Sequence, residues 1–174
     1  MKKNLIVYAT QYGCAEEVAK TIAAQLEGET TVLNAKTDKV KNIAEYDRII
    51  LGGSLYAGKV QKEIKDFTVA HRNEILSKPL GIFLCGIGLT DTGIANSFEF
   101  SFDQEIREHA KIMDMVGGKL DYSKISFMDK FIINTVTKKM IKYKKDDKLE
   151  NNQLPENTLN EYKIAMIAKI MNKY

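Results

Sequence analysis

The stretch Leu5-Ile-Val-Tyr-Ala-Thr-Gln-Tyr-Gly-Cys-Ala-Glu-Glu-Val-Ala19 predicts how the chain begins to fold. Its first part, residues 5–9, is a continuous apolar run typical of a buried strand. Residues 10–14 form a short polar loop with one glycine, and a helix pattern starts near Glu16. A strand, a loop of small residues and a helix in this order direct backbone N–H groups and a helix N-terminus toward an anion. A ligand that carries a phosphate is therefore the first hypothesis.

Apolar runs recur along the chain, with helical patterns between them. Strands are predicted over residues 5–9, 30–34, 48–53, 80–86 and 112–118. Helices are predicted over residues 16–27, 60–69, 97–110 and 156–174, the last with an apolar stripe of Leu159, Tyr162, Met166 and Ile170. Continuous apolar strands that alternate with helices indicate an α/β fold, a doubly wound, five-stranded parallel sheet with helices on both faces. A single domain over residues 1–174 is expected.

The composition is that of an ordinary globular protein, with 44% hydrophobic and 28% charged residues. No apolar run reaches the ~20 residues of a membrane span, and residues 2–9 are too short for a signal peptide, so we expect a cytoplasmic protein. Two cysteines and two histidines are too few for a disulfide framework or a zinc site, so no metal is expected. The net charge of +3 is mild, and no nucleic-acid partner is expected.

Ligands of doubly wound sheets bind beyond the carboxyl ends of the strands, which selects the loops 10–15, 53–59 and 86–93. The first loop offers the Thr10 hydroxyl and, at Gly13, close approach of the backbone, but it holds no Lys or Arg. The second is rich in glycine around Tyr56, on which a flat ring could stack. Each loop alone also fits an ordinary turn. Three such loops at three strand ends favour a ligand site.

Together the three loops resemble those of the flavodoxin family. The resemblance implies noncovalent FMN, with its phosphate at Thr10, Gln11, Tyr12, Gly13, Cys14 and Ala15. It implies contacts to the flavin ring from Ser54, Leu55, Tyr56, Ala57 and Gly58 and from Gly86, Ile87 and Gly88. The chain departs from the family pattern at Ala15, which has no hydroxyl, so the phosphate has one side-chain donor fewer.

The second half of the chain is similar to a narrower, flavodoxin-like group, the menaquinone-dependent protoporphyrinogen IX dehydrogenases. The similarity lies in Gly117-Gly-Lys-Leu-Asp-Tyr122 and in Phe127-Met-Asp-Lys-Phe-Ile-Ile133. It implies an FMN-binding oxidoreductase that oxidises protoporphyrinogen with a quinone acceptor. No catalytic acid or base stands out, as expected where the cofactor carries the chemistry. The alternative is a flavodoxin-type electron carrier without its own substrate; a quinone reductase fed by a nicotinamide cofactor stays open, without a second nucleotide motif.

Residues 119–148 form a basic segment with nine lysines and four aspartates, and part of it reads as an amphipathic helix. Its apolar face is Met128, Ile132, Val136 and Met140, beside Phe127 and Phe131, and the lysines cluster at Lys138, Lys139, Lys142, Lys144 and Lys145. Such a basic helical insertion near the C-terminal end fits three roles. It can cover an edge of the sheet, lie through residues 127–145 on the inner face of the cell membrane, or bind a protein partner.

The two cysteines receive different interpretations. Cys14 lies near a helix N-terminus, where the pKa of its thiol can fall, although a small residue that merely fits the loop is the simpler explanation. Cys85 ends an apolar run and is expected to be part of the core.

Overall fold

The computed structural model describes residues 1–121, 123–131, 133, 135 and 156–174. Five parallel strands lie in the order β2-β1-β3-β5-β6, and a short strand, β4, pairs antiparallel with β3. The strands are β1 (Lys3–Ala9), β2 (Glu29–Asn34), β3 (Arg48–Tyr56), β4 (Lys59–Val60), β5 (Leu80–Cys85) and β6 (Ile112–Met115). The expected doubly wound parallel sheet is confirmed.

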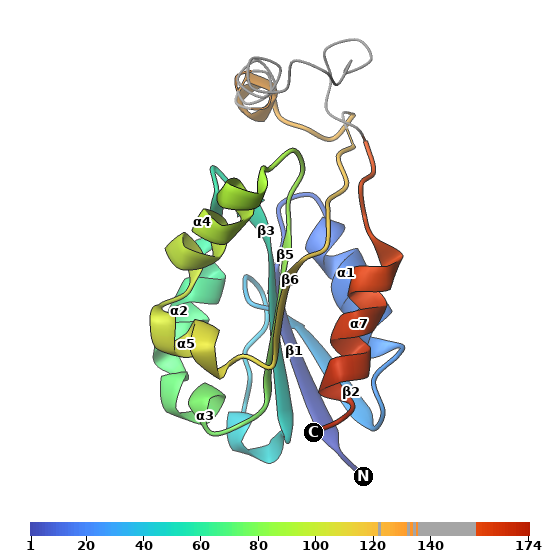
Figure 1. Cartoon of the computed structure of the whole chain (residues 1–174), viewed down its shortest axis with the longest axis vertical. Helices are drawn as coiled ribbons and strands as arrows, with labels where there is room; N and C mark the ends of the chain where they lie inside the picture. Colours follow the sequence, from blue (N-terminus) through green and yellow to red (C-terminus); the bar gives the residue numbers. More distant parts are fainter. Residues whose placement is uncertain (122, 132, 134, 136–155) are drawn as a thin grey trace.

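Helices cover both faces of this sheet (Figure 1). One face carries α1 (Cys14–Ala23) and α7 (Glu161–Met171). The other carries α2 (Lys62–Ala70), α3 (Arg72–Leu76), α4 (Asp91–Ser101) and α5 (Gln104–His109), and a short 3-10 turn, η1, spans Ile43–Glu45. This two-sided cover explains why the central strands β1, β3 and β5 are largely apolar rather than alternating.

Strand geometry divides the core into two clusters. Successive side chains of a strand point to opposite faces, so Leu5 and Val7 of β1 pack on the α2–α5 side while Ile6 and Tyr8 pack against α1 and α7. The register sets Ile6 beside Ile50 of β3. All of these side chains are at most 6% exposed, so the sheet is a rigid base for the loops at its carboxyl edge.

The expected helix over residues 97–110 is wrong as a single helix. It is two helices, α4 and α5, because Phe102 and Asp103 have extended backbone between them. The Asp103 carboxylate accepts a hydrogen bond from the Ile106 N–H at 3.0 Å and so starts α5. Phe98, Phe102 and Ile106 are all buried, so the apolar spacing holds although the helix does not continue.

The predicted face of the C-terminal helix is also wrong. The buried residues of α7 are Ile164, Ile167, Ala168 and Met171, whereas Tyr162 is 74% exposed. The helix begins at Glu161 rather than Glu156, because the Asn160 side chain accepts a hydrogen bond from the Lys163 N–H. The predicted and the observed sets of residues both have helical spacing. The helix packs against α1 and β6 with the observed set, which contains the small residue Ala168.

Two strands differ in length from the prediction. β3 continues past Gly53 to Tyr56 and returns as β4 through a two-residue turn at Ala57 and Gly58, both with positive φ. β6 stops at Met115 instead of residue 118, and Gly117 has a φ of 84°.

Between β6 and α7 the chain makes an excursion beyond the carboxyl edge of the sheet, where residues 127–131, 133 and 135 are helical (Figure 1). We call these residues the overlying helix. The two limbs of the excursion pair at its base, since Thr158 N–H donates to Gly118 O at 2.8 Å and Leu120 N–H donates to Glu156 O at 2.7 Å. The expected helical insertion is therefore present. The rest of its predicted apolar face, Ile132, Val136 and Met140, and all five clustered lysines lie outside the described residues.

Candidate cofactor site

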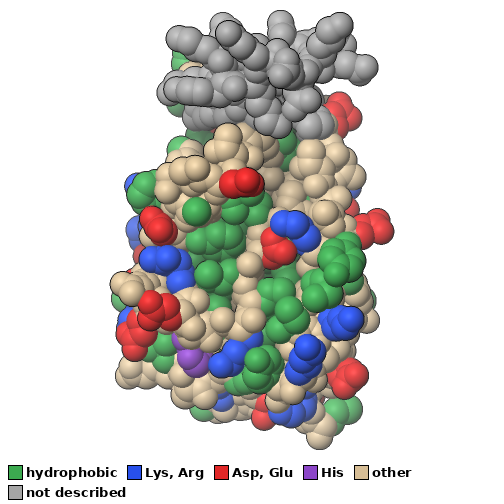
Figure 2. Space-filling view, viewed as in Figure 1, with side chains coloured by type: hydrophobic (Ala, Val, Ile, Leu, Met, Phe, Trp, Pro, Cys, Tyr) green, Lys and Arg blue, Asp and Glu red, His purple; other side chains and the backbone are tan. Residues whose placement is uncertain are grey.

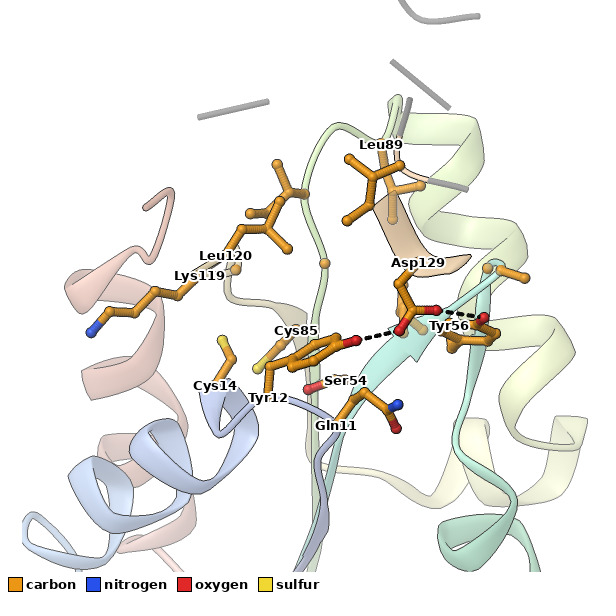
Figure 3. Close-up of a pocket in the computed structure, with 17 residues that line it drawn as sticks. Gln11, Tyr12, Cys14, Ser54, Tyr56, Cys85, Leu89, Lys119, Leu120 and Asp129 are labelled. Atoms are coloured by element: carbon orange, nitrogen blue, oxygen red, sulfur yellow. Dashed lines mark hydrogen bonds between the residues drawn. The ribbon is translucent and has the colours of Figure 1, made fainter. Parts of the chain in front are cut away.

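A pocket lies where the loops after β1, β3 and β5 meet, at the carboxyl edge of the sheet (Figure 3). The excursion contributes two further walls, one from Gly118, Lys119 and Leu120 and one from Asp129 and Ile133 of the overlying helix. The three predicted loops therefore converge, and a fourth segment joins them.

The first loop ends in an uncapped helix N-terminus. The Thr10 hydroxyl accepts a hydrogen bond from the Gly13 N–H at 3.0 Å and lies 3.4 Å from the Ser54 hydroxyl, which ties this loop to the second. Gly13 is the N-cap of α1 with a φ of 90°, and no side chain caps the helix there. The first N–H groups of α1 thus lack a side-chain acceptor, an arrangement suited to a phosphate.

The second loop is the hairpin of β3 and β4. Its tip presents Leu55, Tyr56, Ala57 and Gly58 to the pocket. Tyr56 is 45% exposed, and its hydroxyl donates a hydrogen bond to Asp129 Oδ1 at 2.8 Å. The hydrogen bond of the Tyr56 hydroxyl therefore holds the Tyr56 ring at the pocket wall.

Asp129 joins the overlying helix to two of the loops (Figure 3). Besides the bond from Tyr56, the Tyr12 hydroxyl donates a hydrogen bond to Asp129 Oδ2. The Asp129 N–H donates to the Ser126 hydroxyl at 3.1 Å, and the Ser126 N–H donates to the Tyr12 hydroxyl oxygen at 3.3 Å. The hydrogen bonds from Tyr12 and then Tyr56 hold the pKa of the Asp129 carboxyl below its ordinary value.

The third loop is held from the side of the excursion. The Gly86 N–H donates to Gly117 O at 2.9 Å, and a Cβ added at Gly118 would lie only 2.7 Å from the Ile87 side chain. The backbone of residues 117–118 therefore packs directly on this loop. Leu89 and Leu120 add apolar surface to the pocket.

Most of the predicted site residues line this pocket: Gln11, Tyr12, Cys14, Ser54, Leu55, Tyr56, Ala57, Gly58, Gly86 and Ile87. Four predicted residues do not line it: Thr10, Gly13, Ala15 and Gly88. Thr10 and Gly13 form the turn that positions the first loop, whereas Ala15, the second residue of α1, is fully buried. That each residue contacts the cofactor stays a prediction.

The sequence prediction of the site omitted Cys85, Leu89, Gly118, Lys119, Leu120, Asp129 and Ile133. The segments 117–122 and 127–133 carried the narrower resemblance but were not assigned to the site. The available signal was a carboxylate, Asp129, in the mostly apolar segment 127–133. A carboxylate that such a segment buries needs hydrogen-bond donors, and Asp129 is 7% exposed.

Comparison with known proteins agrees with this geometry. A family model described as a flavodoxin domain matches residues 5–148. This chain belongs to the flavodoxin domain family. A short-chain flavodoxin associated with a non-canonical PDU bacterial microcompartment has the same fold, with a TM-score of 0.58, 16% identity, and coverage of 99% of this chain and 98% of that one. A rubredoxin oxygen:oxidoreductase from the anaerobe Desulfovibrio gigas also superposes, with a TM-score of 0.54, 10% identity, and coverage of 99% of this chain and 36% of that one.

Two curated proteins named protoporphyrinogen IX dehydrogenase [quinone] are similar in sequence. The Leishmania major protein is 25% identical over 146 residues, which cover 78% of this chain and 62% of that protein. The Escherichia coli K12 protein is 22% identical over 143 residues, which cover 78% of this chain and 79% of that protein. The match thus spans less than two thirds of the Leishmania protein.

FMN is the cofactor of this flavodoxin domain, and the residues present fit it. The uncapped N-terminus of α1 suits the phosphate, and the apolar walls with Tyr12 and Tyr56 suit a flat aromatic ring. No Lys or Arg lies in residues 10–15, so within this loop the phosphate would be held by neutral donors and the helix dipole. Among the described residues, no helix has both the length and the apolar character needed to cross a bilayer.

Proposed function

We propose that this flavodoxin-like oxidoreductase oxidises protoporphyrinogen IX and passes the reducing equivalents to a quinone. The observation that carries the proposal is the added wall of the cofactor pocket, formed by Leu120, Asp129 and Ile133. These residues come from the excursion, whose sequence resembles the protoporphyrinogen dehydrogenases. The names of the two curated relatives support the same substrate class.

FMN, when bound, supplies the acceptor for electrons and protons, or for a hydride, from the porphyrinogen. The chain positions it: the first loop would hold the phosphate, and the second and third loops would hold the ring on either side. Tyr56 is oriented by Asp129, and Leu89 and Leu120 offer apolar surface to a large flat substrate. Lysines of the basic segment would attract the acidic propionates of the porphyrinogen.

A steady-state assay under anaerobic conditions tests this proposal. With a catalytic amount of FMN-loaded protein, sustained formation of fluorescent protoporphyrin from protoporphyrinogen IX should require menaquinone or a soluble analogue. Omission of the protein, of FMN or of the quinone provides the three controls. Fluorescence that rises at the same rate without the quinone would contradict a quinone-linked reaction.

The electron-carrier alternative makes a different prediction. A carrier exchanges single electrons with a protein partner, so stepwise titration with a one-electron reductant should give two well-separated reduction steps, and porphyrinogen should leave the flavin oxidised. Two-electron reduction by porphyrinogen without resolved steps would favour the dehydrogenase.

We also propose that the overlying helix contacts an anionic membrane, where a lipid-soluble quinone is found. Phe127, Met128 and Phe131 are 89%, 76% and 73% exposed, although Asp129 on the same helix is buried against the pocket. Hydrophobic side chains with adjacent lysines are typical of helices that lie on a bilayer surface. On the described part of the face in Figure 2, Lys, Arg, Asp and Glu side chains lie among hydrophobic ones.

Sedimentation with vesicles that contain phosphatidylserine tests the membrane contact. The wild type should sediment in low salt, and the variant Phe127→Ser/Met128→Ser/Phe131→Ser should stay in the supernatant. A matched control replaces two hydrophobic residues exposed elsewhere, Val69→Ser/Tyr162→Ser, and should sediment like the wild type. Neutralising Lys138, Lys139 and Lys142 should weaken binding too; unchanged binding in low salt would contradict the role of charge.

A further inference from the structure

The two cysteines of the chain lie side by side in the cofactor pocket. Cys14 is the first residue of α1 and Cys85 is the last residue of β5, and both line the cavity. Figure 3 shows their sulfur atoms next to one another, and each thiol shifts the pKa of the other. Neither the cofactor chemistry nor the proposed reaction uses this pair.

The environment makes the two thiols unequal. The hydrogen bond from Cys85 lowers the pKa of the Cys14 thiol, and the Lys119 backbone N–H adds to this effect, whereas burial and the Glu17 carboxylate oppose it. The same thiol–thiol contact, together with burial, raises the pKa of Cys85 well above its ordinary value. Cys14 also begins α1 and is 7% exposed against 3% for Cys85, so we assign Cys14 as the nucleophile and Cys85 as the second thiol.

We propose that Cys14 and Cys85 are a modification site, an oxidisable dithiol that a hydroperoxide converts into a disulfide across the cofactor pocket. The geometry that carries the proposal is a pair of neighbouring thiols that line the same cavity. This role lies beyond the proposed dehydrogenase activity and does not depend on the porphyrinogen or the quinone.

The reaction balances in two steps. The Cys14 thiolate attacks the outer oxygen of the hydroperoxide, so that an S–O bond forms, the O–O bond breaks, and the leaving alkoxide or hydroxide takes a proton. The Cys85 sulfur then attacks the Cys14 sulfenic acid: an S–S bond forms, the S–O bond breaks, and the hydroxyl leaves as water with the Cys85 proton. Two thiols and one hydroperoxide thus give one disulfide, one alcohol or water, and one water.

Such a disulfide would join the start of α1 to the end of β5. It would fix the first loop to the third and take up part of the cavity. The chain has only these two cysteines, so an intramolecular disulfide has a single possible pairing.

Peptide mapping of the full-length protein tests the proposal. The reduced, folded protein is treated with hydrogen peroxide, free thiols are alkylated, and the tryptic digest is analysed without reductant. The expected product is a disulfide-linked pair of peptides, residues 4–20 and residues 73–107. Its mass should equal the sum of the two reduced peptides less two hydrogen atoms, and dithiothreitol should separate the two peptides. The same treatment in denaturant should link them far more slowly, because the fold holds the sulfurs together.

Single variants assign the two roles. Cys85→Ser should trap the sulfenic acid of Cys14, detected as a dimedone adduct, and Cys14→Ser should leave Cys85 alkylatable, reacting at least about tenfold more slowly with peroxide. Wild-type protein in which the cysteines are only alkylated or separately over-oxidised would overturn the proposal, as would linkage only between two chains. The wild-type map decides the question even where a variant fails to fold, and none of these results depends on FMN turnover.

Discussion

At the scale of single residues, Asp129 is the contact through which the overlying helix reaches the cofactor loops. Its two oxygens accept hydrogen bonds from Tyr12 of the first loop and Tyr56 of the second. Asp129→Asn keeps one acceptor oxygen and replaces the other with an amide donor, so one of the two tyrosines loses its acceptor. Loss of about one such hydrogen bond should weaken FMN binding about three- to tenfold, as measured by flavin fluorescence quenching.

A second aspartate of the excursion provides the matched control. Asp121 accepts hydrogen bonds from Ser123 and pairs with Lys124, and it does not line the pocket. Asp121→Asn should therefore bind FMN like the wild type. Equal affinities for both variants would show that Asp129 does not position the two tyrosines.

The lowered pKa of Asp129 predicts a pH dependence. A carboxyl whose pKa is depressed by folding adds stability that is fully present above its unfolded pKa of about 3.9 and is lost as the pH falls through the lower folded value. Without FMN, the difference in thermal midpoint between wild type and Asp129→Asn should be constant from neutral pH to about pH 4 and should shrink below it. A difference that disappears between about pH 6 and pH 8 would point to a group of another type.

At the scale of elements, the base of the excursion depends on Gly117. Its φ is 84°, and an added Cβ would lie 1.9 Å from the Thr158 carbonyl oxygen of the returning limb. Gly117→Ala should lower the free energy of unfolding by more than about 2 kcal/mol, measured by urea denaturation without FMN, because conformational strain and a backbone clash add together.

A substitution at Gly58 distinguishes conformational strain from the backbone clash. Gly58 also has a positive φ, of 78°, but nothing lies within 4 Å of an added Cβ. Gly58→Ala should therefore cost only about 1 kcal/mol, the strain of a left-handed conformation. If the two variants cost the same, the contact between Gly117 and Thr158 is not what makes glycine necessary.

Sequence patterns predicted some of the helices and strands correctly and missed other features of the fold. Apolar runs located the central strands β1, β3 and β5, because a strand buried on both faces is largely apolar. The edge strand β2 was located by its β-branched residues instead. The break between α4 and α5 was missed, since Phe98, Phe102 and Ile106 keep helical spacing across it and only the cap at Asp103 reveals it. The contribution of the overlying helix to the site was missed too, because it depends on contacts between Asp129 and residues far away in the sequence.

At the scale of the whole molecule, a buried polar cluster fastens the C-terminal helix to the start of the sheet. The Arg48 guanidinium of β3, 3% exposed, donates hydrogen bonds to Asn4 of β1, to Glu27 O and to Asn172 Oδ1. Asn172 also accepts from the Glu27 N–H at 2.9 Å and donates to Gln25 O at 3.0 Å. One side chain thus connects α7, β3 and the segment between α1 and β2.

Asn172→Ala should reduce the free energy of unfolding by about 1–3 kcal/mol, because it leaves Arg48 with fewer acceptors and the Glu27 N–H without its acceptor. Chemical denaturation measures this change. Asn157→Ala, on the exposed returning limb, is the control and should cost less than about 1 kcal/mol. A cost for Asn172→Ala no larger than that of the control would show that the cluster does not hold α7 in place.

The flavin pocket, extended by the excursion, is proposed to accept electrons from a porphyrinogen. The most direct test mixes FMN-loaded protein with protoporphyrinogen IX under anaerobic conditions and follows flavin absorbance, before menaquinone is added. The oxidation to protoporphyrin releases six electrons and each FMN accepts two, so the protein is used in more than threefold excess over the porphyrinogen. We then expect the flavin absorbance to bleach as porphyrin fluorescence rises, and to return when the quinone is added. The contrary result is a flavin that porphyrinogen leaves oxidised although a one-electron reductant still reduces it. This result would contradict the dehydrogenase proposal and favour an electron carrier.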